Sequence, residues 1–227
     1  AAVVQHALEL LDPAERPDIV PAIDQLAAHA EPRIRAAALA VSQRPGALQA
    51  ALLDPEPYVR ATAAVVLGES ATTTLDALAG GSQEERRALA YAIGWLNARA
   101  LVPRLDAMLI GADALTAREI AHAIERHPDP RHIVGLIAFL GDRDCRTDVR
   151  RALAAIGEPA LRALVMAWAD PTTPMDVRRH IPRTIQHFEP KAAMAALVDA
   201  LDREDDGVTL YKILRAPPAP GAPEGRH

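Results

Sequence analysis

The feature that most constrains the fold of this chain is a residue pair, one aliphatic and one arginine, that returns after a polar turn containing Asp or Pro. The clearest pairs are Ile34-Arg35, Val59-Arg60, Val149-Arg150 and Val177-Arg178. Alanine and Leu or Ile follow most of these pairs at helical spacing, and the period is roughly 25 to 32 residues, within the range of repeat architectures. The chain is therefore expected to repeat one small structural unit.

Plainer segments lie between these pairs and have the apolar spacing of amphipathic helices. In the segment 158–169 the apolar residues Leu161, Leu164, Val165 and Trp168 recur at i, i+3, i+4 and i+7. Half of the chain is apolar but only 3% is aromatic, and a mix dominated by Ala and Leu favours closely packed helices over sheets. The 19 prolines indicate short, frequently interrupted helices.

One such helix pair cannot bury its apolar stripe alone, so neighbouring pairs must stack to build a continuous core. We therefore expect an all-α fold of about seven antiparallel helix pairs, preceded by an extra helix near Val3–Leu11. The Pro-rich end, residues 217–227, has the composition of a disordered segment. The expected organisation is a single repeat domain over residues 1–216 with a disordered tail at 217–227.

The segment 54–68, DPEPYVRATAAVVLG, fits the pattern D-P-x-x-x-V-R-x-x-A-x-x-x-L-G. Through this motif the chain resembles the HEAT family, especially the short HEAT-like repeats of bacterial proteins of the PBS lyase type. The resemblance covers nearly the whole chain. It implies a right-handed α-solenoid whose first helices form the convex face and whose aliphatic-Arg helices line the concave face. In this family the arginine commonly pairs with the turn aspartate, which implies the ion pairs Asp54–Arg60 and Asp170–Arg178.

The segment 176–188, DVRRHIPRTIQHF, reads as one helix that contains Pro182. A proline inside a helix costs about 3 kcal/mol or more, and HEAT repeats more often carry one in the first helix of a pair, whereas this helix is the second. The inward stripe of this helix would hold Val177, Ile181, Ile185 and Phe188. We expect His180, Arg183 and His187, at i, i+3 and i+7, to be exposed together on another stripe.

The exposed faces of the aliphatic-Arg helices carry Arg, His and Tyr, although the chain has a net charge of -5. Arginine and tyrosine are enriched at interfaces, and guanidinium groups form bidentate bonds with carboxylates. The alternative is a solvated polar face with no partner. We predict that this face binds a protein or an acidic peptide through nine residues: Arg87, Tyr91, Arg118, His122, Arg151, Arg179, His180, Arg183 and His187.

Patterns for catalysis and metal binding are weak in this sequence. The single cysteine, Cys145, lies among acidic residues, which raise the pKa of a thiol. The chain has no G-x-S-x-G motif and no glycine-rich phosphate loop. His180 and His187 would be about 10 Å apart along an ideal helix, too far to chelate one ion as a close pair, and no His-Glu dipeptide occurs. We therefore predict no catalytic residue, no metal and no cofactor.

Two other function classes stay open. A HEAT-like lyase-type enzyme or small-molecule binder would use a pocket around Tyr91, Trp95 and His122. A nucleic-acid binder usually shows a basic domain, whereas this chain has a pI of about 5.9, so we predict no nucleic-acid partner.

The sequence also leads to expectations about location. No apolar run reaches the roughly 18 residues that a membrane span needs, and a single cysteine fits a reducing compartment. We expect a cytoplasmic protein without a direct membrane span. Because the sequence lacks an initiator Met and stops abruptly, we also expect it to belong to a larger bacterial protein. That larger protein could be attached to a membrane.

Overall fold

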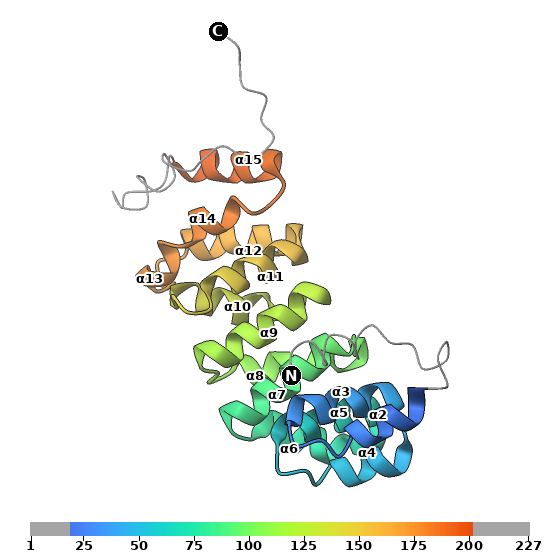
Figure 1. The fold of residues 1–227 in the computed structure, drawn as a ribbon. Helices are drawn as coiled ribbons and strands as arrows, with labels where there is room; N and C mark the ends of the chain where they lie inside the picture. Colours follow the sequence, from blue (N-terminus) through green and yellow to red (C-terminus); the bar gives the residue numbers. More distant parts are fainter. Residues whose placement is uncertain (1–18, 202–227) are drawn as a thin grey trace. The chain divides into compact units, whose positions relative to one another are not determined.

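Every regular element between residues 19 and 201, the part of the chain that the computed structural model describes, is a helix (Figure 1). The predicted all-α class is confirmed for this part. The chain divides into two compact units, and the boundary between Ala123 and Ile124 lies inside α9 (Ala114–Arg126). The predicted helix near Val3–Leu11 and the predicted tail at 217–227 lie outside the described residues. The single domain over 1–216 stays a prediction.

Short helices alternate with tight turns in the first unit. Its elements before α9 are α2 (Val20–Leu26), α3 (Pro32–Ser42), α4 (Pro45–Ala51), α5 (Pro57–Leu67), the 3-10 turn η2 (Gly68–Ala71), α6 (Thr72–Gly80), α7 (Gln83–Trp95), η3 (Arg99–Arg104) and α8 (Leu105–Leu109). Pro32, Pro45 and Pro57 each occupy the first turn of a helix, where a missing N–H breaks no intrahelical bond. Many of the prolines can therefore start helices without interrupting them.

The core of the first unit is built from small and aliphatic side chains. α5 packs against α3 and α7, and also against α4 and α6. Val59 and Ala63 of α5 share a buried cluster with Leu39 of α3 and Leu48 of α4. Gly94 shows how close two helices come: a Cβ atom placed there would lie 3.0 Å from the Cα atom of Ala123 in α9. Alanine and glycine at these positions let neighbouring helices approach closely.

Arg35, the arginine of the first residue pair, fastens α3 to the turn before it and to the next repeat. Its Nη1 donates to the carbonyl oxygens of His29 (2.9 Å) and Ala30 (3.0 Å). Its Nε and Nη2 donate to the two carboxylate oxygens of Asp54 at 3.1 and 2.9 Å. We call this arrangement the arginine clamp: two carbonyl oxygens six and five positions earlier, and one carboxylate from the following repeat.

Arg60 makes the same clamp in α5. Its Nη1 donates to the carbonyl oxygens of Asp54 and Pro55, both at 2.8 Å, and its Nη2 donates to Glu85 Oε1 at 2.8 Å. Glu85 also closes the capping box of α7, because its carboxylate accepts the N–H of Ser82 at 2.9 Å while Ser82 Oγ accepts the N–H of Glu85. The start of α7 and its link to α5 therefore depend on one carboxylate.

The predicted ion pair between the carboxylate of Asp54 and Arg60 is replaced by a different arrangement. Arg60 binds the backbone carbonyl of Asp54, and the carboxylate of Asp54 bonds Arg35 from the preceding repeat. That carboxylate also accepts the N–H of Glu56 at 2.9 Å, which fixes its orientation in the turn. The predicted arginine–aspartate link between repeats is present, but its register is shifted by one repeat.

The second unit begins at the end of α9 and contains two 3-10 turns before α11. Its further elements are η4 (Pro130–His132), α10 (Ile133–Ala138), η5 (Phe139–Gly141), α11 (Arg146–Ile156), α12 (Glu158–Ala169), α13 (Met175–Arg178), α14 (Ile181–Ile185) and α15 (Pro190–Leu201). α11 packs against α10 and α12, and α14 packs against α11, α12 and α15. Leu136, Leu153 and Leu164 are fully buried in this unit.

The segment 176–188 is not one helix. α13 ends at Arg178, a turn follows at 179–180, and α14 starts at Ile181 with Pro182 in its first turn. A proline in a first turn breaks no helical hydrogen bond, so the expected mid-helix strain is absent. The predicted inward stripe is largely confirmed, because Val177, Ile181 and Ile185 are buried.

We expect Asp54→Asn to destabilise the fold by about 1–2 kcal/mol at neutral pH, because it weakens charge-assisted bonds to Arg35. Burial alone raises the pKa of Asp54. Hydrogen bonds from Arg35 and from the Glu56 backbone, with the charges of Arg35 and Arg60, outweigh burial and hold the pKa below its ordinary value of 3.8. Stability from such a carboxylate is present above the unfolded-state pKa and is lost as the pH falls through the folded-state pKa.

The measurement is urea unfolding of wild type and Asp54→Asn at about pH 7 and about pH 3. The difference in unfolding free energy should be large at the higher pH and shrink at the lower one. Glu158→Gln is the control, since it removes an exposed i,i+4 pair with Arg162 that should contribute little. A difference of equal size at both pH values would contradict the clamp as the source of stability.

We expect Gly94→Val to lower the free energy of unfolding by about 1–3 kcal/mol, because the added atoms overpack the contact with Ala123. Gly46→Ala in α4 is the matched control. A Cβ atom at Gly46 would meet nothing within 4 Å, so the variant should gain roughly 0.5–1 kcal/mol from helix propensity. Thermal or urea unfolding compares the two. Equal stability of Gly94→Val and wild type would show that α7 and α9 are not in close contact.

Candidate functional site

Three aromatic side chains of the first unit form a row over α5 and α7. The rings of Tyr58 and Tyr91 are edge to face with centroids 5.7 Å apart, and those of Tyr91 and Trp95 are tilted with centroids 5.9 Å apart. All three are half-buried. The chain has only three tyrosines and two tryptophans, so this row gathers most of them.

Arg33 of α3 lies over this row. Its guanidinium carbon is 5.2 Å from the ring centroid of Tyr58 and 5.7 Å from that of Tyr91, which is within cation–π distance for both rings. Arg33 is exposed and makes no ion pair with another described residue. We call Arg33, Tyr58, Tyr91 and Trp95 the aromatic–arginine surface.

The charges around this surface have both signs. Burial raises the pKa of Tyr58, and the nearby charges act against one another: Arg33 and Arg87 lower it, whereas Glu119 and Glu84 raise it. Glu119 belongs to α9, so the field at Tyr58 has contributions from α3, α7 and α9. The surface is therefore apolar at its centre and mixed in charge at its edge.

The four residues that the sequence predicted for the binding face in this unit have different environments. Tyr91 is part of the aromatic row, whereas Arg87 pairs with Asp113 at 3.4 Å. Arg118 and His122 both approach Glu119, at 4.0 and 3.6 Å. Tyr91 and the edge residue Arg87 are thus linked to a common surface with Tyr58.

Sequence reasoning missed Arg33 and Tyr58. Each occupies the position directly before an aliphatic-Arg pair, Ile34-Arg35 and Val59-Arg60. The shared position within the repeat was the signal that could have found them, since equivalent positions of neighbouring repeats face the same way.

The five residues predicted in the second unit also differ in exposure. Arg151 is exposed and pairs with Glu125 at 3.4 Å and with Asp148. Arg179 and His180 are half-buried in the turn between α13 and α14, whereas Arg183 and His187 are exposed. The first pair forms the break between α13 and α14, and the second pair lies after that break.

Arg150 of α11, which the sequence placed among the structural arginines, is the unexpected charge of this unit. It is 8% exposed, and its Nε donates to Thr184 Oγ1 of α14 at 3.3 Å. Burial, followed by the positive charges of Arg183 and Arg146, lowers the pKa of Arg150 to about 10. Although His187 is exposed over much of its surface, desolvation is the largest cause that lowers its pKa, followed by the charges of Arg150 and Arg183.

Asp170 and Arg178, the second ion pair that the family resemblance implied, lie near each other. The carboxylate of Asp170 accepts from the hydroxyl and the N–H of Thr172 at 2.7 and 2.8 Å. These bonds lower the pKa of Asp170 first, and the charge of Arg178 adds to the effect. The aspartate therefore acts mainly within its own turn.

The thiol of Cys145 is an unfavourable nucleophile. Cys145 is fully buried, and its Sγ lies 3.9 Å from the carbonyl oxygen of Phe139. Burial, followed by the charges of Asp142 and Asp148, raises the pKa of the thiol to about 12. Among residues 19–201 no group of three or more His, Cys, Asp or Glu side chains is placed to hold a metal ion.

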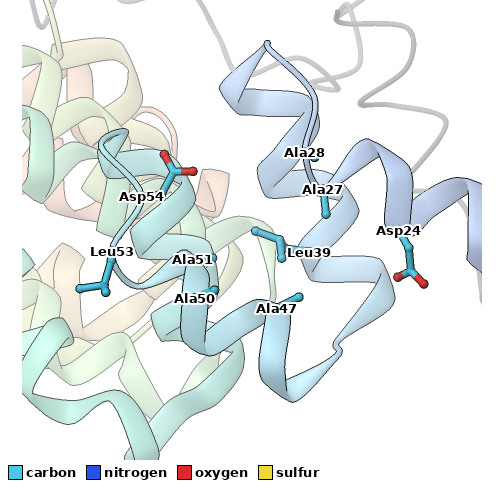
Figure 2. A pocket seen from close by; sticks show the side chains of 9 residues that line it. All are labelled: Asp24, Ala27, Ala28, Leu39, Ala47, Ala50, Ala51, Leu53 and Asp54. Carbon is cyan, nitrogen blue, oxygen red and sulfur yellow. The ribbon is translucent and has the colours of Figure 1, made fainter.

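Described residues of the first unit form two shallow pockets that include none of Tyr91, Trp95 and His122. The larger has a volume of about 360 Å³ and is lined mainly by alanines of α4 and of the turn after α2, together with Leu39 (Figure 2). Its two carboxylates are already engaged, Asp24 with Arg44 at 2.7 Å and Asp54 with Arg35 at 2.9 Å. The smaller, of about 240 Å³, contains the Arg60–Glu85 pair. Both pockets thus present side chains that already serve the fold.

Comparison with protein-family models, with curated proteins and with solved structures found no match to this chain. In the part of the chain that the structure describes, no helix is long and apolar enough to cross a membrane.

We expect Cys145 in the native protein to react with a thiol reagent such as DTNB at less than about a tenth of the rate seen after unfolding, because a buried thiol of raised pKa supplies little thiolate. Absorbance at mildly alkaline pH, with and without denaturant, measures both rates. Rapid stoichiometric labelling of the folded protein would contradict the burial of this residue.

Proposed function

We propose that this chain is a non-catalytic interaction module, a HEAT-like right-handed α-solenoid of about seven antiparallel helix pairs, that binds a protein or an acidic peptide. The observation that carries the proposal is the aromatic–arginine surface, in which Arg33 lies over Tyr58 and Tyr91. The regular alternation of helices and the arginine clamps that join successive repeats support the repeat architecture.

The residue types of this surface suit protein recognition. Tyr, Trp and Arg are the residues most enriched among those that dominate binding energy. The rings of Tyr and Trp bury a large apolar area on binding, while only two side-chain torsions per residue become fixed. In a chain with 3% aromatic residues, three neighbouring aromatic side chains that stay half-exposed are a considerable concentration. The surface offers stacking area and charge, not a nucleophile beside a base, so binding fits it better than catalysis.

Arg33 favours an acidic partner. Its charge faces solvent above two rings, whereas Arg87 already has Asp113 as a partner. An incoming carboxylate can bond the guanidinium in bidentate fashion while apolar atoms of the partner cover the rings. Glu84 and Glu119 at the edge would repel an acidic group placed off the Arg33 position. A segment with one or two acidic residues beside apolar ones fits this pattern best.

The wider binding face belongs to the same proposal. Arg118 and His122 border the surface near Glu119. The second unit has its own predicted binding residues: Arg151, Arg179, His180, Arg183 and His187. We also propose a cytoplasmic location, supported by the single, free and buried Cys145.

We expect Arg33→Glu to weaken peptide binding at least about tenfold, a change of roughly 1.4 kcal/mol. A displayed random-peptide library would be selected on the immobilised protein, and the enriched sequences synthesised for calorimetric titration. Selected peptides should combine Asp or Glu with apolar residues. Arg33 is exposed, so its reversal should not unfold the chain, which circular dichroism verifies.

Arg162→Glu is the matched control, because Arg162 is exposed on α12 and lies in the other unit. Binding should be unchanged in that variant. Peptides that bind Arg33→Glu as tightly as wild type would overturn the surface assignment. A metabolite or chromophore retained by the purified protein in native mass spectrometry would favour the small-molecule class instead.

A further inference from the structure

Arg150 is a buried cation whose charge no carboxylate among the described residues compensates. Its only hydrogen bond with a described residue goes to the neutral hydroxyl of Thr184. The charges that act on it, those of Arg183 and Arg146, are both positive. Burial of an unpaired charge is costly, and buried arginines in proteins are normally paired with an acid. An arginine in this environment favours a negatively charged ligand from outside the described residues.

The two carbonyl bonds of an arginine clamp are made in this repeat by another residue, Arg146, which explains why Arg150 is left over. Arg146 donates to the carbonyl oxygens of Leu140 and Gly141, both at 2.5 Å, six and five positions earlier. These are the same offsets that Arg35 and Arg60 use. Arg150 lies one helical turn further along α11, beyond the reach of those carbonyls, and its guanidinium turns to α14 instead.

Two more cationic side chains lie near Arg150, one from α14 and one from the turn that follows α14. Arg183 directly precedes Thr184, the hydrogen-bond partner of Arg150, and His187 follows Thr184 by about one turn. Arg183 and His187 make no side-chain hydrogen bond or ion pair with another described residue, and both are exposed. The nearest acid along the chain, Glu189, accepts the N–H groups of Lys191 and Ala192 at 3.0 and 2.9 Å and so caps α15.

The backbone that carries these groups is held firmly. Ile181 and Ile185 of α14 are fully buried, and Pro182 fixes the first turn of that helix. The hydroxyl of Thr184 donates to the carbonyl oxygen of His180 at 2.8 Å, which leaves its lone pair for Arg150. The cationic side chains therefore have a preorganised base, which reduces the entropy cost of binding.

We infer that Arg150, Arg183 and His187 form a binding site for a phosphate group. Two guanidinium groups offer planar pairs of donors that match phosphate oxygens, and the imidazole adds a donor when it is protonated. A carboxylate carries one negative charge, whereas a phosphate monoester carries between one and two at neutral pH, closer to the charge of this cluster. The site lies in the second unit and is distinct from the aromatic–arginine surface of the first.

A phosphorylated side chain of a protein and a small phosphate metabolite share this chemistry. The first test uses the full chain with inorganic phosphate, followed by NMR of the histidine ring signals, with His187 assigned through His187→Gln. The charged groups that act on His187 are Arg150 of α11 and Arg183 of α14. In phosphate-free buffer His187 should titrate below its ordinary pKa of 6.5, and saturation with phosphate should raise that pKa. A pKa at or above 6.5 without phosphate would overturn the inference, because another anion would then neutralise the cluster.

The affinity for phosphate should fall at least about tenfold in Arg183→Gln, which changes an exposed residue and should fold normally. Arg143→Gln is the matched control: it removes the same charge from an exposed position before α11 and should leave the affinity unchanged. Equal losses in both variants, or equal binding of acetate and phosphate, would overturn the inference in favour of unspecific attraction.

Arg150→Met gives an independent readout through thermal unfolding. Phosphate should raise the melting temperature of wild type by mass action, whereas Arg150→Met should show no phosphate-dependent shift. Without phosphate the variant should melt at or above the wild-type temperature, because it removes an uncompensated buried charge. A phosphate-dependent shift that persists in Arg150→Met would overturn the role of Arg150.

A short peptide with one phosphoserine, compared with its unphosphorylated form and with inorganic phosphate, distinguishes the sources. Tighter binding of the phosphopeptide than of inorganic phosphate identifies a protein ligand, and equal binding identifies a small phosphate; both results support the site. Arg33→Glu should leave phosphate binding unchanged, so failure of the peptide-binding surface and failure of the phosphate site can be told apart.

Discussion

The arginine clamp, which Arg35 and Arg60 make, is the interaction that joins successive repeats in the first part of the chain. At each clamp one guanidinium bonds two carbonyl oxygens of the turn that follows the previous helix, as Arg35 does with His29 and Ala30. Those carbonyls lie in the turn, outside any helix, and so have no intrahelical donor. The five N–H donors of arginine can serve two carbonyls and still reach a carboxylate of the next repeat. Lysine, a compact charge on a flexible stem, does not offer this geometry, which explains why the repeated pair ends in arginine.

The clamp also determines which side chains stay on the surface. Because the arginine of each pair turns toward the preceding turn and the aliphatic residue before it is buried, the position before the pair is directed outward. Arg33 and Tyr58 occupy this position in successive repeats and so come to lie next to each other. The aromatic–arginine surface is thus a consequence of the repeat itself. Its specificity comes from the residues that each repeat places at one equivalent position.

Helix content, the alternation of helices and turns, and the buried positions could be predicted from the sequence because apolar spacing and turn residues report them directly. The partner of Asp54 could not be predicted, because a carboxylate in a turn can reach the arginine of either neighbouring repeat. Its orientation depends on the N–H of Glu56, which the carboxylate accepts. Pro182 was also ambiguous. A proline inside a helix and a proline that starts a new helix look alike in sequence. Pro182 starts a new helix because residues 179–180 form a turn. The predicted binding face stays a prediction. The aromatic–arginine surface was only partly predicted, through Tyr91 in the binding face and Trp95 in the alternative pocket.

Arg150 shows why a repeated motif does not assign one role to all its arginines. Val149-Arg150 has the same pattern as Val59-Arg60, yet the carbonyls that a clamp requires are already bonded by Arg146, one turn earlier. An arginine released from the clamp keeps its charge but loses its acceptors. If Arg150 were fully exposed, it would be an ordinary surface charge. Arg150 is only 8% exposed, bonds Thr184 and lies near Arg183, so its charge destabilises the fold unless an anion binds. A solvated arginine would have no need of such burial. The retention of a buried positive charge next to two further cationic groups is therefore more readily explained by ligand binding than by folding.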